Sequence, residues 1–237
     1  MLFRSRLAAP WQSGMTGIGH DAAVTGDLTS VHVFFGPDWA GRMTYLSEMN
    51  ETAGLAAIHL GYTPETLDQA QFDASIAAIS DAIAQGWVRR ITGNSYIEDM
   101  TTGDVVLAMA WSGDVLGLLV PDQRDDQDFR FVLPDEGGMR FTDNMVIPKG
   151  AQNKAQAEVF IDWYYDPANA AQIEAYVKYV CPVKGAADAI AAIDPEAAGN
   201  LLMFPDDAMQ ARLHDFRAQT PDERAAWDAA FAAAIGL

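Results

Sequence analysis

The sequence has one cysteine, few basic side chains and no long apolar run. Cys181 has no partner for an internal disulfide, and no histidine near it in the sequence suggests a reactive thiol. Lys and Arg total 15 against 33 Asp and Glu, a formal net charge of -18. A nucleic-acid partner is therefore not expected, because phosphate binding needs a basic surface. Half of the 237 residues are apolar, but no run of about 18 residues lacks a charge, which argues against a membrane-spanning helix.

Signatures of catalysis and of cofactor binding are also missing. There is no Gly-x-Ser-x-Gly nucleophile elbow and no phosphate loop. The four histidines, His20, His32, His59 and His214, are not spaced as metal ligands. The stretch Gly17–Ala22 matches G-x-G-x-x-A, but Gly26 interrupts any helix after it, so we reject it as a dinucleotide loop. We therefore expect a protein that is not an enzyme and binds no cofactor or metal.

Two segments each place an aromatic ring a few residues from a carboxylate. Trp111 and Asp114 follow the apolar run Val105–Ala110, and Phe141 and Asp143 come about thirty residues later. A ring can cover methylene groups and offer its π-face to a cation, while a carboxylate neutralises an ammonium group. A strongly acidic surface would also attract cations, although acidity often serves solubility alone. The pattern predicts a binding protein for small amines.

Three further residues are candidates. Glu48 and Glu51 lie three apart in the first turn of a helix expected to start at Ser47, so both can point from one face. Acidic residues also favour helix N-termini because of the dipole and need no ligand there. Tyr179 fits either a packed ring or a pocket wall. Taken singly, each candidate is compatible with a structural role, and the hypothesis requires that they converge.

The expected elements alternate between strands and helices, which favours an α/β architecture. Residues 8–35, rich in glycine, are expected to form turns and short strands. Further strands are expected at 41–46, 104–110, 129–133 and 145–147. Helices are expected at 47–61, 67–85, 95–102 and from 113 to before Pro121, followed by helices that begin at Asn153, Asp166 and Thr220.

Several stretches, taken in order, carry a resemblance to a known family. They are Thr16–Gly19, Asp38–Met43, Ala110–Asp114, Asp143–Ala151, Asn153–Lys154, Ala157–Ile161, Tyr164–Pro167 and the segment around Tyr179. In this combination the chain resembles the substrate-binding proteins of spermidine/putrescine ABC transporters, with the putrescine-binding kind most similar. The similarity runs from about residue 9 to the end.

The resemblance implies an α/β periplasmic-binding-protein fold of type II, with one lobe nearly complete and the other partial. Residues 14–140 and 187–237 would form the second lobe. Residues 1–13 and 141–186 would be a remnant of the first lobe. Relatives begin with a signal peptide and a further lobe segment, so the resemblance implies a chain truncated at its start. Leu2–Ser5 is also what a common sequencing-adapter end encodes, so we expect the start Met1–Arg6 to be an artefact. We then expect exposed apolar surface on 141–186 and at best weak ligand binding.

The resemblance also implies a role for each candidate residue. Trp111 and Phe141 would wall the aliphatic chain of a linear polyamine, Asp114 and Asp143 would hold one ammonium, and Glu51, helped by Glu48, would hold the other. Tyr179 would close part of the pocket. The implied partners are a polyamine, putrescine or spermidine, and the permease subunits of an ABC transporter, with the protein a periplasmic monomer.

Three alternatives stay open. The first is the same fold binding another small ligand, such as an amino acid, an opine or a metal chelate. The second is an α/β enzyme using Glu48, Glu51 or Asp143 as acid–base groups, although the sequence offers no nucleophile, metal set or cofactor loop. The third is a pseudo-subunit or receptor that senses polyamines without transporting them.

Overall fold

The computed structural model describes residues 8–237, so the expectation about Met1–Arg6 lies outside the described residues. The chain divides into two compact units. The larger unit comprises Met15–Arg140 and Ala211–Leu237, and the smaller comprises residues 8–14 and Phe141–Gln210. In the smaller unit α8 (Pro167–Val177) packs on α9 (Ala186–Ile190), which packs in turn on the short helix at Pro195–Ala198. The assignment of the units to lobes stays a prediction.

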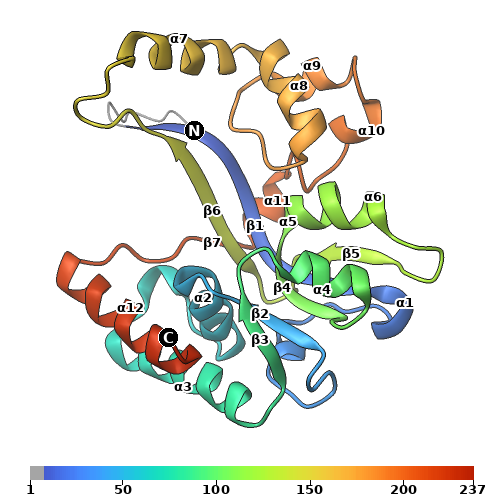
Figure 1. Cartoon of the computed structure of the whole chain (residues 1–237), viewed down its shortest axis with the longest axis vertical. Helices are drawn as coiled ribbons and strands as arrows, with labels where there is room; N and C mark the ends of the chain where they lie inside the picture. Colours follow the sequence, from blue (N-terminus) through green and yellow to red (C-terminus); the bar gives the residue numbers. More distant parts are fainter. Residues whose placement is uncertain (1–7) are drawn as a thin grey trace. The chain divides into compact units, whose positions relative to one another are not determined.

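The larger unit is built on a mixed sheet (Figure 1). The strand order is β3-β2-β4-β1-β6-β7, and β5 pairs with β1. β2 runs parallel to β3 and β4, whereas β1 runs antiparallel to β4 and β5. The strands are β1 (Ala9–Asp21), β2 (Met43–Leu46), β3 (Val88–Thr92), β4 (Leu107–Trp111), β5 (Phe129–Val132), β6 (Gly138–Met145) and β7 (Leu213–His214).

Three long helices of this unit pack beside one another, as Figure 1 shows for α2, α3 and α12. α3 (Gln69–Ala84) and α12 (Pro221–Ile235) both begin with a capping box, which satisfies free N–H groups at the helix start. The rings of Phe72 and Trp227 stack at 3.9 Å and are fully buried. The remaining elements are α1 (Ala22–Thr25), η1 (Val31–Phe34), α2 (Met49–His59), η2 (Pro64–Thr66), α4 (Tyr96–Thr102), α5 (Ser112–Asp114), η3 (Val115–Leu119) and α6 (Val120–Asp122).

Some helix and strand boundaries in the structure differ from those predicted from the sequence. α2 is capped at Glu48 and not at Ser47, and α7 (Lys154–Tyr164) has no side-chain cap from Asn153. The helix predicted to stop before Pro121 continues through it, because η3 is a π-helical turn that changes the hydrogen-bond register ahead of the proline. The strand predicted at 145–147 instead ends at Met145.

The stretch predicted as turns and short strands is largely one strand, β1, of 13 residues. Its glycines lie where neighbouring groups approach the backbone. A Cβ atom at Gly14 would lie 2.3 Å from the Phe141 ring, and one at Gly19 would lie 2.6 Å from Cβ of Ala110. These glycines therefore mark close packing within a strand and not turns.

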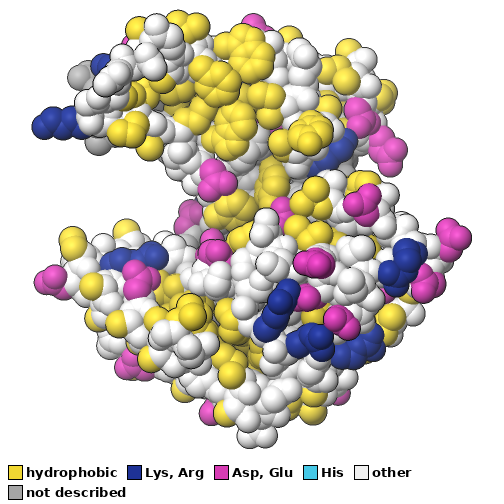
Figure 2. Space-filling view, in the orientation of Figure 1, with side chains coloured by type: hydrophobic (Ala, Val, Ile, Leu, Met, Phe, Trp, Pro, Cys, Tyr) yellow, Lys and Arg dark blue, Asp and Glu magenta, His cyan; other side chains and the backbone are white. Residues whose placement is uncertain are grey.

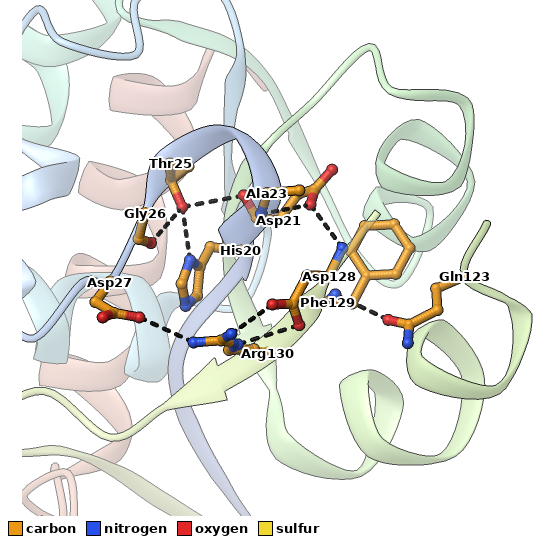
Figure 3. Close-up of polar contacts among 10 residues, drawn as sticks. All are labelled: His20, Asp21, Ala23, Thr25, Gly26, Asp27, Gln123, Asp128, Phe129 and Arg130. Atoms are coloured by element: carbon orange, nitrogen blue, oxygen red, sulfur yellow. Dashed lines mark hydrogen bonds and ion pairs between the residues drawn. The ribbon is translucent and has the colours of Figure 1, made fainter. Parts of the chain in front are cut away.

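A polar network fixes the end of β1 to β5 (Figure 3). The Asp21 carboxylate accepts from the backbone N–H of Asp128 at 2.9 Å, and the buried His20 ring contacts the Thr25 hydroxyl at 2.7 Å. Burial lowers the pKa of His20, which keeps the ring neutral near pH 7. The Arg130 guanidinium pairs with Asp27 and Asp128 at the surface.

The smaller unit is mainly helical. Its helices are α7, α8, α9, α10 (Pro195–Ala198) and α11 (Asp207–Gln210), and the first residues of β1 lie against them. The Tyr165 hydroxyl donates to the carbonyl of Pro10 at 2.8 Å, and the Gln12 amide donates to Glu174 at 2.8 Å. Among the described residues, no helix is long and apolar enough to cross a membrane.

Apolar side chains are exposed on the smaller unit, as the sequence predicted for 141–186. Figure 2 shows hydrophobic side chains gathered on its visible face. On α7 the exposed fractions are 70% for Val159, 50% for Phe160 and 46% for Trp163. Exposed apolar patches often mark interaction surfaces.

Candidate functional site

The parallel strands of the larger unit bring three chain segments to one edge of the sheet. β2, β3 and β4 end at Leu46, Thr92 and Trp111, and their carboxyl ends face the same way because all three run parallel. A Cβ atom at Gly93 would lie 4.0 Å from Oε1 of Glu48, so this carboxylate reaches the end of β3. Open α/β sheets bind ligands at the carboxyl ends of their strands, which makes this edge the candidate site of the unit.

Trp111 and Asp114 are joined at this edge by a tyrosine that the sequence analysis did not single out. The Tyr96 hydroxyl accepts from the backbone N–H of Trp111 at 3.1 Å and donates to Oδ2 of Asp114 at 3.0 Å. The Tyr96 and Trp111 rings meet edge to face at 6.2 Å. Asp114 is 8% exposed and Tyr96 is fully buried. A carboxylate in a fixed orientation beside an indole ring can receive an ammonium group with little reorganisation.

Glu48 and Glu51 occupy the start of α2. Glu48 is the N-cap residue but makes no side-chain capping bond; its Oε2 atom accepts from the Ser47 hydroxyl at 3.1 Å. Glu51 lies in the first turn, and both residues are half-buried. The positive end of the helix dipole attracts negative charge at this position. Two negative charges are thus held at the edge of the sheet where Trp111 also lies.

The other three predicted residues lie in the smaller unit. Phe141 and Asp143 both belong to β6, two residues apart, so they share one face of the strand. The Phe141 and Tyr179 rings meet edge to face at 6.1 Å, and Asp143 is exposed. The Ser13 hydroxyl donates to the Phe141 carbonyl at 2.6 Å, which fixes β6 against β1 beside this ring pair.

The smaller unit also holds a buried titratable group. Glu174 is 0% exposed, and its Oε1 atom accepts from Gln12 at 2.8 Å and from the Tyr164 hydroxyl at 3.4 Å. Burial raises the pKa of Glu174 to about 7. Burial also raises the pKa of the neighbouring Cys181 thiol, so this cysteine is a poor nucleophile at neutral pH.

Comparison with known proteins identifies the family. Residues 6–200 match the model of the bacterial extracellular solute-binding proteins. The chain belongs to this family. Its members bind solutes and are not enzymes, which confirms the prediction of a binding protein over a catalyst. The fold is that of type II periplasmic binding proteins, as the resemblance implied.

Similar relatives carry names that refer to polyamines. The chain is 30% identical over 179 residues to a putrescine/cadaverine-binding protein of Pseudomonas aeruginosa, covering 75% of this chain and 49% of the relative. It is 24% identical over 231 residues to a putrescine-binding periplasmic protein of Escherichia coli, and the match covers 92% of this chain and 61% of that protein. The chain thus spans about half to three fifths of the length of these relatives.

A solved structure shows the same fold. The spermidine/putrescine ABC transporter substrate-binding protein of Streptococcus pneumoniae superposes with a TM-score of 0.78 at 20% identity, covering 97% of this chain and 68% of that one.

Proposed function

We propose that this chain binds a small linear diamine, of the putrescine and cadaverine kind, as substrate-binding subunit of an ABC importer outside the cytoplasm. The observation that carries the proposal is Asp114, which is buried and shares the Tyr96 hydroxyl with the backbone N–H of Trp111. A desolvated carboxylate at a strand end that also carries an indole ring suits an alkylammonium better than an anion or a neutral ligand. The names of the relatives point to the same ligand class.

Each candidate residue has a role in this proposal. Asp114 pairs with one ammonium while Trp111 covers the adjoining methylenes. Glu48 and Glu51 supply the charge for an ammonium at the start of α2. Phe141, Asp143 and Tyr179 of the smaller unit keep the roles that the resemblance gives them. The proposed partners are the diamine and the permease subunits of the transporter, and we expect the protein to act as a monomer.

Replacing Asp114 by Asn tests the proposal. The Asp114→Asn variant keeps the shape of the side chain but leaves a bound ammonium without its counter-charge, so diamine affinity should fall by about tenfold or more. Titration calorimetry with putrescine and with cadaverine measures this. Asp122→Asn, at an exposed residue of α6, removes the same formal charge and should change affinity less than about twofold. Equal affinities for the two variants would refute the proposal.

A further inference from the structure

Two histidines that are far apart in the sequence meet in the larger unit. His32 belongs to η1 and His59 is the last residue of α2, and their Nδ1 atoms lie 2.6 Å apart. The rings meet edge to face, with centroids 4.7 Å apart. The two residues are 27 positions apart, so their spacing in the sequence does not indicate a pair. The fold alone creates it.

A carboxylate influences which nitrogen of the first ring carries the proton. Oε1 of Glu136 lies 3.7 Å from Nε2 of His32, and the Ser30 hydroxyl and the Val31 N–H donate to this carboxylate at 2.5 Å and 3.0 Å. A negative charge beside Nε2 favours the tautomer with its proton on Nε2, which leaves the lone pair of Nδ1 facing His59. Histidines that bind metal ions usually donate from their other ring nitrogen to a carboxylate, carbonyl or water.

The second ring is held in place by packing. The Phe35 ring stacks on that of His59 with centroids 4.1 Å apart, and Phe35 contacts in turn the buried Tyr45 ring at 5.9 Å. Burial lowers the pKa of His59, and the neighbouring His32 ring lowers it further. Neutral imidazole is the form that binds a metal ion, so the ring is suited to this role near neutral pH.

We propose that His32 and His59 form a binding site for a divalent transition-metal ion of the Zn²⁺, Ni²⁺ or Cu²⁺ kind. The ion lies between the two Nδ1 atoms, in place of the hydrogen bond that joins them. Bonds of about 2.0–2.1 Å to one tetrahedral ion place two nitrogens about 3.3 Å apart, so the rings must separate by roughly 0.7 Å. The His32 side chain is 55% exposed on a short surface turn and is free to make this movement.

The chemistry of the ligands determines which ions fit. Within residues 8–237, no three or more His, Cys, Asp or Glu side chains are grouped to hold a metal ion, so the two imidazoles form an open site and water fills the other positions. Imidazole suits Zn²⁺, Ni²⁺ and Cu²⁺, whereas Mg²⁺ prefers oxygen ligands. The net charge of -18 favours any cation. A bound ion would tie η1 to the end of α2 and stabilise the larger unit.

Nuclear magnetic resonance on the full chain tests the site. Titration with ZnCl₂ near pH 7.5, where imidazoles are largely deprotonated, should shift the ring resonances of His32 and His59 together. His214, which lies beside Glu65 at 3.1 Å, should respond only at higher concentration, because it offers a single imidazole. MgCl₂ should leave the His32 and His59 resonances unchanged.

Variants measured by titration calorimetry with ZnCl₂ identify the ligands. His59→Ala removes one of two ligands and should lower Zn²⁺ affinity by about tenfold or more. Glu136→Gln keeps the shape of the side chain but removes the charge beside His32, and affinity should again fall about tenfold. The matched control is His214→Ala, at another histidine next to a carboxylate, and its affinity should stay within about twofold of wild type.

Two results would overturn the proposal. One is Zn²⁺ binding that leaves the His32 and His59 ring resonances unchanged, because other side chains would then hold the ion. The other is equal Zn²⁺ affinity for His59→Ala and His214→Ala. The wild-type titration decides the matter even if a variant fails to fold. Diamine binding enters none of these measurements, so their outcome is independent of the proposed function.

Discussion

The Tyr96 hydroxyl fixes two parts of the candidate site at once. It accepts from the backbone of Trp111 and donates to the carboxylate of Asp114, and it is fully buried. Removing it leaves a backbone N–H group without this acceptor and takes a donor from a buried carboxylate. Buried polar groups that lose a partner cost about 1–3 kcal/mol. Tyr96 is therefore a positioning residue for Asp114.

We expect Tyr96→Phe to lower both stability and diamine affinity. The free energy of unfolding should fall by about 1–3 kcal/mol, and putrescine affinity by several-fold, because Asp114 is no longer oriented. Urea unfolding and titration calorimetry measure the two effects. Tyr62→Phe, at a half-buried tyrosine of the same unit, is the control. Unchanged affinity in folded Tyr96→Phe would show that Asp114 does not need this hydrogen bond to bind its ligand.

At the residue scale, the sequence shows those contacts of the candidate site that join residues close along the chain. Trp111 and Asp114 follow an apolar strand and share a short segment, so their pairing is visible in the sequence. Tyr96 reaches them from α4, fifteen and eighteen residues earlier, and nothing in its local sequence separates it from a tyrosine packed in a core. Contacts of this kind depend on the tertiary fold and cannot be derived from spacing alone.

At the scale of elements, local signals predicted helices well and β1 poorly. The starts of α3 and α12 depend on capping contacts within three residues, Asp68 with Gln71 and Thr220 with Glu223. The glycines of β1 were instead interpreted as turn residues. Their role depends on Phe141 and Ala110, which come from other strands, and this close approach has no local signature.

α8 carries a buried carboxyl group that makes the stability of its unit depend on pH. The pKa of Glu174 is raised by burial from 4.5 to about 7 in the folded state. Between these two values the folded state binds more protons than the unfolded state, so stability falls as pH rises through this window. Gln12 and Tyr164 donate to the group from β1 and α7, and the Cys181 thiol also faces it. None of these three neighbours is positively charged, so none compensates the charge of an ionised Glu174.

Replacing Glu174 by Gln should remove this pH dependence. The variant should approach wild-type stability near pH 4.5 and exceed it above pH 7, by up to about 3 kcal/mol, the equivalent of the pKa difference. Urea unfolding at a series of pH values measures the change. Glu158→Gln, at an exposed glutamate of α7, should leave the profile of the wild type unchanged. If the free energy of unfolding changes with pH in the same way for wild type and Glu174→Gln, ionisation of Glu174 does not lower the stability of the folded state.

At the scale of the whole molecule, the order of the expected elements predicted the class of fold, whereas the cationic ligand stays a proposal. The alternation of elements indicated α/β, which the fold confirms. The net charge of -18 excludes no ligand by itself, but it creates a field that acts on every approaching cation. Under the proposed function, such a field would influence how fast a diamine arrives, whereas the contacts of Trp111, Asp114 and the α2 carboxylates would determine how long it stays bound.

This division predicts how salt changes binding. Raising NaCl from about 0.02 M to about 0.2 M shortens the screening length several-fold, so the association rate of putrescine should fall by roughly fivefold or more. The dissociation rate should change less than about twofold, because the buried Asp114 contact is poorly screened. Stopped-flow fluorescence measures both rates, and a monoamine, with half the charge, should show a weaker slope. A salt effect confined to the dissociation rate would mean that exposed ion pairs hold the ligand and that the field of the protein does not steer it.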